Sequence, residues 1–224
     1  DDDGTEIIVP RPAPVDGGDA SLHVYQLDGT AAADWGSSYT FSDGGDMDAT
    51  PAIGDIDGDG DLELVVVTWL DPSATSNTEE THVWALEADR TQLWHTTYDT
   101  SSSGGGWDDD EHAIASPILA VINTKDSLGS DNWDVFSCTT PECFALDGSD
   151  GRSGGGGQSE LWHVTLENRE NSNRIFNSPA AADVDGDGLL DLVLDGGVWA
   201  ADLADLVVRD GDITITDEQG EPAS

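Results

Sequence analysis

Two short acidic loops in this chain carry carboxylates at a spacing that suits a metal ion. The first loop places Asp55, Asp57, Asp59 and Glu63 at its positions 1, 3, 5 and 9, with glycines at positions 4 and 6. Calcium takes six or more oxygen ligands at about 2.4 Å, and glycines let the backbone curl around the ion. The backbone carbonyl of Asp61, at position 7, would supply a further oxygen. This loop therefore predicts a calcium site.

The second loop repeats the pattern, with aspartates at the same four positions: Asp183, Asp185, Asp187 and Asp191. An EF-hand has its last acidic ligand at position 12 and helices on both sides. Here the last acid comes at position 9, and short β-branched runs follow at once, which indicates strands. We expect about two Ca²⁺ sites; the alternative is a pair of acidic surface turns that bind nothing.

The composition limits the classes of partner. The chain has 224 residues and a formal net charge of −40, with only 7 lysines and arginines. Nucleic acids and anionic membranes would be repelled, and no apolar run is long enough to insert into a membrane. Bound divalent ions or high salt must relieve the self-repulsion, which favours an extracellular or cell-surface protein, halophilic in character. The 8 tryptophans argue against an acidic disordered chain.

The elements around the loops read as short strands in a repeated unit. Pro51, Pro117 and Pro179 mark the starts of three similar units, 66 and 62 residues apart. Four short strands at such a period predict an all-β fold, a β-propeller of four-stranded blades. We expect about three full blades plus a partial one, in a four-bladed ring or as part of a larger propeller. The expected divisions are a partial blade at 1–48, blades at 49–98, 115–166 and 178–216, and a disordered tail at 217–224.

The unit at 115–166 departs from the others. Val121 and Asn123 stand where the first loop has Asp55 and Asp57, so a calcium site is in doubt there. Cys138 and Cys143 flank the expected turn between two strands of this unit, which favours a disulfide across a hairpin. Two free buried thiols are the alternative.

One further stretch is a candidate ligand loop on the face opposite the calcium loops. It contains six consecutive residues: Trp107, Asp108, Asp109, Asp110, Glu111 and His112. It could hold a second metal ion or stack a sugar on the indole; the alternative is a solvated acidic loop. The sequence shows no nucleophile elbow, phosphate loop or HExxH helix, so we identify no catalytic residues.

The repeats resemble the FG-GAP/VCBS type of integrin α-subunit propellers and of many secreted microbial proteins. The resemblance rests on Phe41, on the dipeptides Thr50-Pro51 and Ser178-Pro179, and on the loops DIDGDGDLE and DVDGDGLLD. It implies that each loop joins the first two strands of a blade and holds a structural calcium ion. The implied ligands include the carbonyl of Leu189 in the second loop.

This resemblance implies a secreted or cell-surface module that functions in binding or adhesion. The expected partners are an extracellular protein or glycan, and further blades of the same or a neighbouring chain. The alternative is the propeller domain of a secreted enzyme, either a polysaccharide lyase or a quinoprotein-like protein. A quinoprotein would need cationic groups around a central cofactor, which 7 lysines and arginines make hard to build.

Overall fold

The protein is all-β in the part that the structure describes. The computed structural model describes residues 5–14, 18–33, 35–36, 38–42, 45–70, 80–99, 115–120, 133–139, 142–148, 160–165, 178–182, 191–193, 205–209 and 212–216. These residues form short antiparallel strands and contain no helix. The expected tail at 217–224 lies outside this part of the chain.

The first sheet has three strands in the order β1-β2-β3. They are β1 (Glu6–Arg11), β2 (Ser21–Gln26) and β3 (Tyr39–Thr40). Trp35 precedes β3 in a turn, with its side chain buried, and its backbone oxygen accepts a hydrogen bond of 2.8 Å from the guanidinium of Arg90.

The second and third sheets each have four strands that pair in chain order. The second consists of β4 (Ala52–Gly54), β5 (Glu63–Leu70), β6 (Glu80–Leu86) and β7 (Gln92–Asp99). The third consists of β8 (Ile118–Ala120), β9 (Asp134–Cys138), β10 (Glu142–Leu146) and β11 (Glu160–Thr165). Each sheet thus begins with a three-residue strand beside a longer second strand.

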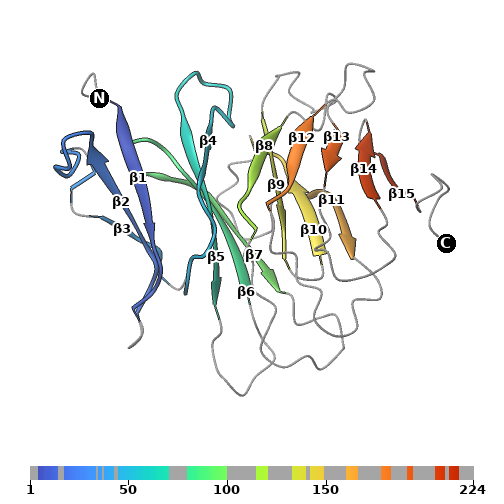
Figure 1. Ribbon diagram of the computed structural model, residues 1–224, viewed down its shortest axis with the longest axis horizontal. Helices are drawn as coiled ribbons and strands as arrows, with labels where there is room; N and C mark the ends of the chain where they lie inside the picture. Colours follow the sequence, from blue (N-terminus) through green and yellow to red (C-terminus); the bar gives the residue numbers. More distant parts are fainter. Residues whose placement is uncertain are drawn as a thin grey trace.

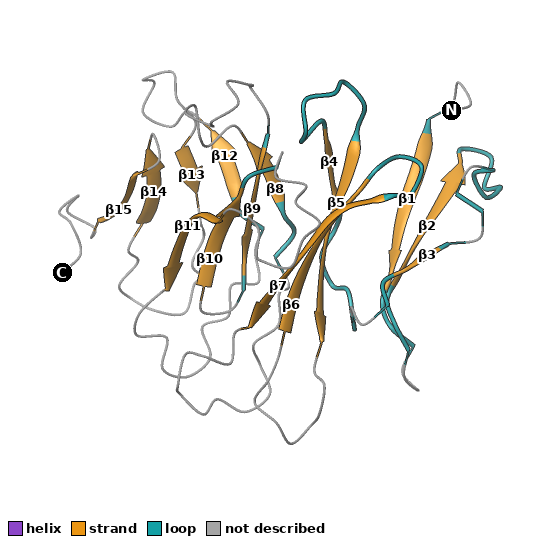
Figure 2. Cartoon of the chain, turned by 180° about the vertical axis from the view of Figure 1, so that it is seen from behind, coloured by secondary structure: helices purple, strands orange, loops and turns teal. Residues whose placement is uncertain are grey.

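Two further pairs of strands follow, β12 (Ala180–Ala182) with β13 (Asp191–Val193) and β14 (Asp205–Arg209) with β15 (Asp212–Thr216). Figure 1 shows the sheets following one another in chain order, with β1–β3 at one end and β14–β15 at the other. The view from behind in Figure 2 agrees. The short strand β8 lies next to both β4 and β12.

Two hydrophobic cores fill the spaces between the sheets. Strand β5 contributes to both, because successive side chains of a strand point to opposite faces. Leu64 and Val66 belong to the core shared with the first sheet, and Val65 belongs to the core shared with the third. A strand that is buried on both faces must be apolar throughout, which explains the run Leu64–Val67.

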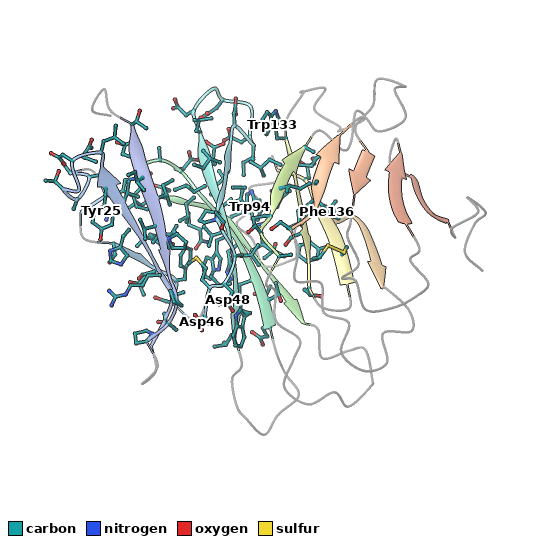
Figure 3. All side chains as sticks on the ribbon, viewed as in Figure 1. Tyr25, Asp46, Asp48, Trp94, Trp133 and Phe136 are labelled. Atoms are coloured by element: carbon teal, nitrogen blue, oxygen red, sulfur yellow. A yellow bond between two sulfur atoms is a disulfide. The ribbon has the colours of Figure 1, made fainter. Side chains whose placement is uncertain are left out.

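Large aromatic side chains, Trp84 and Trp94 among them, fill these spaces. Trp84 packs in the first core against Phe41, with ring centroids 5.4 Å apart. Trp94 lies in the second core, and its indole N–H donates to the backbone oxygen of Gly148, in the third sheet, at 3.1 Å. Figure 3 shows Trp94 between the two sheets. Such rings stabilise the contact by apolar burial and give it a defined geometry.

The predicted disulfide between Cys138 and Cys143 is present. The two residues lie directly opposite each other on β9 and β10, with Cα atoms 4.0 Å apart. Both are buried, and the bond is visible beside Phe136 in Figure 3. It closes the hairpin that carries much of the third sheet's contribution to the second core.

Where the second and third sheets meet, the structure leaves no space for a side chain at Gly148. A Cβ atom there would overlap the backbone oxygen of Trp133 and lie 2.8 Å from the backbone oxygen of Ile56. Gly148→Ala should therefore lower the free energy of unfolding by about 1–3 kcal/mol, the usual cost of overpacking. Urea denaturation followed by tryptophan fluorescence measures this change. An unchanged midpoint would show that the two sheets do not meet this closely.

Candidate metal site

The acidic loop lies between the first two strands of the second sheet. Strand β4 ends at Gly54 and β5 begins at Glu63, and these two residues are paired in the antiparallel ladder. The ladder therefore holds both ends of the loop together. Gly58 and Gly60 have φ angles of 80° and 97°, which side-chain-bearing residues rarely adopt. The glycines let the backbone fold back over the carboxylates.

Carboxylates within the loop accept hydrogen bonds from its own backbone. The two oxygens of Asp55 accept from the N–H groups of Gly58 and Gly60, at 2.7 and 3.1 Å. Asp57 accepts from the N–H of Asp59 at 3.1 Å. These bonds hold the first two carboxylates in place on the inner side of the turn.

The structure brings three of the five predicted ligands of this loop together. Asp55, Asp57 and Glu63 each offer a carboxylate oxygen, and these oxygens lie within 4.8 Å of one another. Asp59 and Asp61 are exposed and do not belong to this group. The Asp59 carboxylate instead accepts a hydrogen bond from the Asp61 N–H at 2.8 Å. The ligand roles of Asp59 and Asp61 stay predictions.

Glu63 is the most unusual member of the group, because its side chain is completely buried, with 0% exposure. Its Oε2 atom accepts a hydrogen bond of 2.8 Å from the backbone N–H of Ile56, whereas Oε1 has no hydrogen-bond partner among the described residues. Burial raises the pKa of Glu63 to about 7, and the negative charges of Asp57 and Asp59 add to this shift. A buried carboxylate oxygen without a donor is costly unless a cation satisfies it. The donor set therefore fits a metal ion.

Ile56 ties the loop to the rest of the fold. It occupies position 2 of the loop, is fully buried, and belongs to the core between the second and third sheets. Its N–H group is also the donor to Glu63. Ile56 thus contacts both the carboxylate group and the core between two sheets. A change in the packing of these sheets would therefore also change the geometry of the loop.

Most other predicted site residues lie outside the described part of the chain. This holds for Asp183, Asp185, Asp187 and Leu189 of the second loop, and for the candidate ligand loop at 107–112. Asp191 is the first residue of β13, where its backbone pairs with Ala182. The predictions for these residues therefore stay predictions.

The second sheet carries a stack of rings that was not predicted from the sequence. The imidazole of His95 lies 3.6 Å from the indole of Trp84, centroid to centroid, with the planes 5° apart. A ring nitrogen of His95 also lies 2.9 Å from a ring nitrogen of His82. Burial lowers the pKa of His95 to about 4, and the neighbouring His82 adds to this shift. The register that pairs Trp84 with His95 was the missing information.

Comparison of the sequence with protein-family models finds no match, and comparison with curated proteins finds none either. Inferences about function therefore rest on the geometry of the loop and of the sheets.

Replacing the buried carboxylate with a neutral amide should raise the stability of the metal-free protein and abolish its stabilisation by calcium. In metal-free buffer at pH 8, Glu63→Gln should raise the free energy of unfolding by about 1–2 kcal/mol, because a charge is no longer held in a buried site above its folded-state pKa. The same variant should lose its stabilisation by calcium. Calorimetry with calcium and with EDTA measures both effects.

The matched control is Glu87→Gln. Glu87 also lies near the loop aspartates, and burial followed by the charge of Asp57 raises its pKa. It does not belong to the carboxylate group, so this variant should keep its calcium response. If both variants respond to calcium alike, Glu63 is not a ligand.

The ring stack predicts a loss of stability in mild acid. Because the folded state lowers the pKa of His95 from 6.5 to about 4, the unfolded state binds the proton first. The resulting stabilisation is complete above pH 6.5 and declines as the pH falls towards 4. Allowing for the partial exposure of the ring, we expect a loss of about 1–2 kcal/mol.

Urea denaturation between pH 7 and 4 tests this expectation. His95→Gln should remove this part of the pH dependence, whereas His23→Gln, which changes a histidine outside the stack, should keep it. Identical pH profiles for His95→Gln and the unmodified protein would contradict the assignment.

Proposed function

We propose that this chain is a calcium-stabilised β-propeller module that binds an extracellular protein or glycan. The observation that carries the proposal is the group formed by Asp55, Asp57 and Glu63, with a fully buried carboxylate oxygen that lacks a donor among the described residues. The group contains only carboxylate ligands, which suit a hard cation. An exposed turn that offers backbone carbonyls and admits water meets the larger and more flexible coordination of calcium better than the strict octahedron of magnesium.

Sheet architecture supports the propeller part of this proposal. The second and third sheets each have four antiparallel strands in chain order, and the short first strands β4, β8 and β12 succeed one another. Hydrogen bonds repeat at the same point: the Thr50 N–H donates to the Ser116 hydroxyl at 2.8 Å, and the Ser116 N–H to the Ser178 hydroxyl at 3.2 Å. Repeated sheets that meet in the same way at each junction are typical of propellers. An FG-GAP/VCBS-type repeat is the form we propose.

An extracellular location follows from the proposed ion. Extracellular calcium modules bind with dissociation constants of about 0.1–1 mM, so they fill outside the cell and stay empty in the cytosol. A disulfide is also favoured by an oxidising compartment. Within the described residues, no helix has the length and apolar character that a membrane crossing requires.

Calcium titration by calorimetry tests the proposal. Saturable binding is expected, and calcium at ten times its dissociation constant should stabilise the fold by about 1.4 kcal/mol. Magnesium at the same concentration should act more weakly. Combining Asp57→Ala with Asp185→Ala should abolish the response, while Asp89→Asn, at an exposed turn, should preserve it.

Equal melting in calcium and in EDTA, at fixed moderate salt, would contradict the metal assignment. If molar salt alone then stabilised the protein strongly, the acidic loops would be part of a salt-adapted surface.

A further inference from the structure

An exposed tryptophan lies directly beside the carboxylate group of the acidic loop. Gly54 and Glu63 are opposite each other in the β4–β5 ladder, so a side chain at position 54 would lie next to that of Glu63, on the same face of the sheet. The indole of Trp133 reaches this place, because its Cε3 and Cζ3 atoms lie 3.0 and 3.4 Å from where a Cβ atom of Gly54 would be. Trp133 therefore borders the group formed by Asp55, Asp57 and Glu63.

The indole is held in place by the contact between the second and third sheets. Trp133 directly precedes β9, and its backbone oxygen lies against Gly148, as does the backbone oxygen of Ile56. Ile56 is also the residue whose N–H donates to Glu63. The same contact between sheets therefore positions the aromatic ring and the buried carboxylate.

Trp133 differs in exposure from the tryptophans of the two cores. Trp84 and Trp94 are 5% and 1% exposed, whereas Trp133 is 44% exposed. Figure 3 shows it at the end of the molecule where the acidic loop lies. A single exposed apolar side chain is ordinary by itself. Here the ring lies beside Glu63, whose buried Oε1 has no donor among the described residues, so an apolar surface and a cation site are offered to the same ligand.

The carboxylate group leaves part of the coordination shell of a calcium ion to other ligands. Three side chains bring their oxygens together, whereas calcium takes six to eight oxygens. The turn is open on its outer side: Asp59 and Asp61 are exposed, and no described atom beyond its chain neighbours lies within 4 Å of a Cβ position at Gly60. Backbone carbonyls fill some of the remaining positions, and water or a hydroxyl of a ligand can reach the others.

The charge around the loop favours a neutral ligand. The chain has 47 aspartates and glutamates against 7 lysines and arginines. A ligand that carries carboxylates, such as an acidic peptide or a polyuronate, would be repelled over most of its length. A neutral sugar avoids this repulsion and still offers paired hydroxyl oxygens to the ion.

We propose that the indole of Trp133 and the carboxylate group together form a binding site for a neutral pyranose unit of a glycan. Two neighbouring hydroxyls of the sugar bind the calcium ion in place of water, because calcium accepts neutral oxygen ligands. The apolar C–H face of the sugar ring packs on the exposed indole, which provides apolar contact area in a fixed orientation. This inference rests on the calcium ion of the proposed function and narrows its partner to a glycan.

Calorimetry on the full chain with calcium tests the site. The probes are the methyl glycosides of mannose, galactose and fucose, each of which is neutral and has neighbouring hydroxyls. At least one should bind saturably in calcium and lose its binding in EDTA.

Variants of the ring separate sugar binding from calcium binding. Trp133→Ala should weaken binding of the sugar at least about tenfold, because the apolar contact is lost. It should keep calcium binding and stabilisation by calcium, which also shows that the variant is folded. Trp133→Phe keeps a flat ring and should retain binding within about threefold. Ile7→Ala, which changes an exposed apolar side chain on β1, is the matched control and should bind as the unmodified chain does.

Terbium in place of calcium tests whether the sugar reaches the ion. Asp185→Ala removes the second predicted loop site, so that one ion is observed. Luminescence lifetimes in H2O and in D2O then give the number of waters on the ion. A saturating amount of the sugar that binds should lower this number by about two, because two hydroxyls take the place of water.

The outcomes distinguish this inference from the proposed function. Calcium binding without binding of any of the three glycosides would overturn the sugar site alone, as would equal sugar affinity in Trp133→Ala and the unmodified chain. Displacement of water from terbium by an aspartate-containing peptide, but not by the sugars, would make a protein the ligand. Absence of calcium binding would overturn the proposed function and the sugar site with it.

Discussion

Strand β5 packs against a neighbouring sheet on each of its two faces. Leu64 and Val66 face the first sheet, while Val65 and Val67 face the third, and all four are buried. Sheets that meet in this way cannot slide or change register without moving a whole set of side chains to the wrong face. The ends of β5, at one of which the acidic loop at 55–62 joins the sheet, are therefore held at a fixed place by this double contact.

The acidic loop is built into this contact, which explains how a cluster of negative charges can persist in a chain that is already strongly acidic. Ile56 is anchored in the apolar core, and its N–H fixes one oxygen of Glu63 at the start of β5. The carboxylate is thus buried because the sheets meet there. The sheets fix the position of Glu63, and the half-buried Asp55 and Asp57 of the turn complete the carboxylate group. A cation at this point would relieve repulsion without requiring the sheets to move.

Features that depend on neighbours along the chain were predictable from the sequence. Short β-branched runs predicted strands after the acidic loops, and carboxylate spacing predicted Asp55, Asp57, Asp59 and Glu63 as ligands, of which Asp55, Asp57 and Glu63 lie together. The hairpin spacing also predicted the Cys138–Cys143 bond. Features set by register across strands or between sheets were not predictable. Examples are the stack of His95 on Trp84, the complete burial of Glu63 and the close approach at Gly148. Tyr25 aligns with Trp84 in sequence, yet it is only half-buried, because it points away from the second sheet.

That difference shows how equivalent residues in a repeat acquire different roles. Leu119 and Ile53 follow equivalent prolines and face the same way, but among the described residues only Leu119 meets a neighbouring short strand. The exposure of Ile53 is therefore not a property of its own sheet, whose strands and register are complete. Ile7 and Val9, which are 47% and 39% exposed on β1, follow the same logic on the face that points away from the second sheet. Apolar side chains at equivalent positions of the repeat therefore differ in exposure according to the strands that are described beside them.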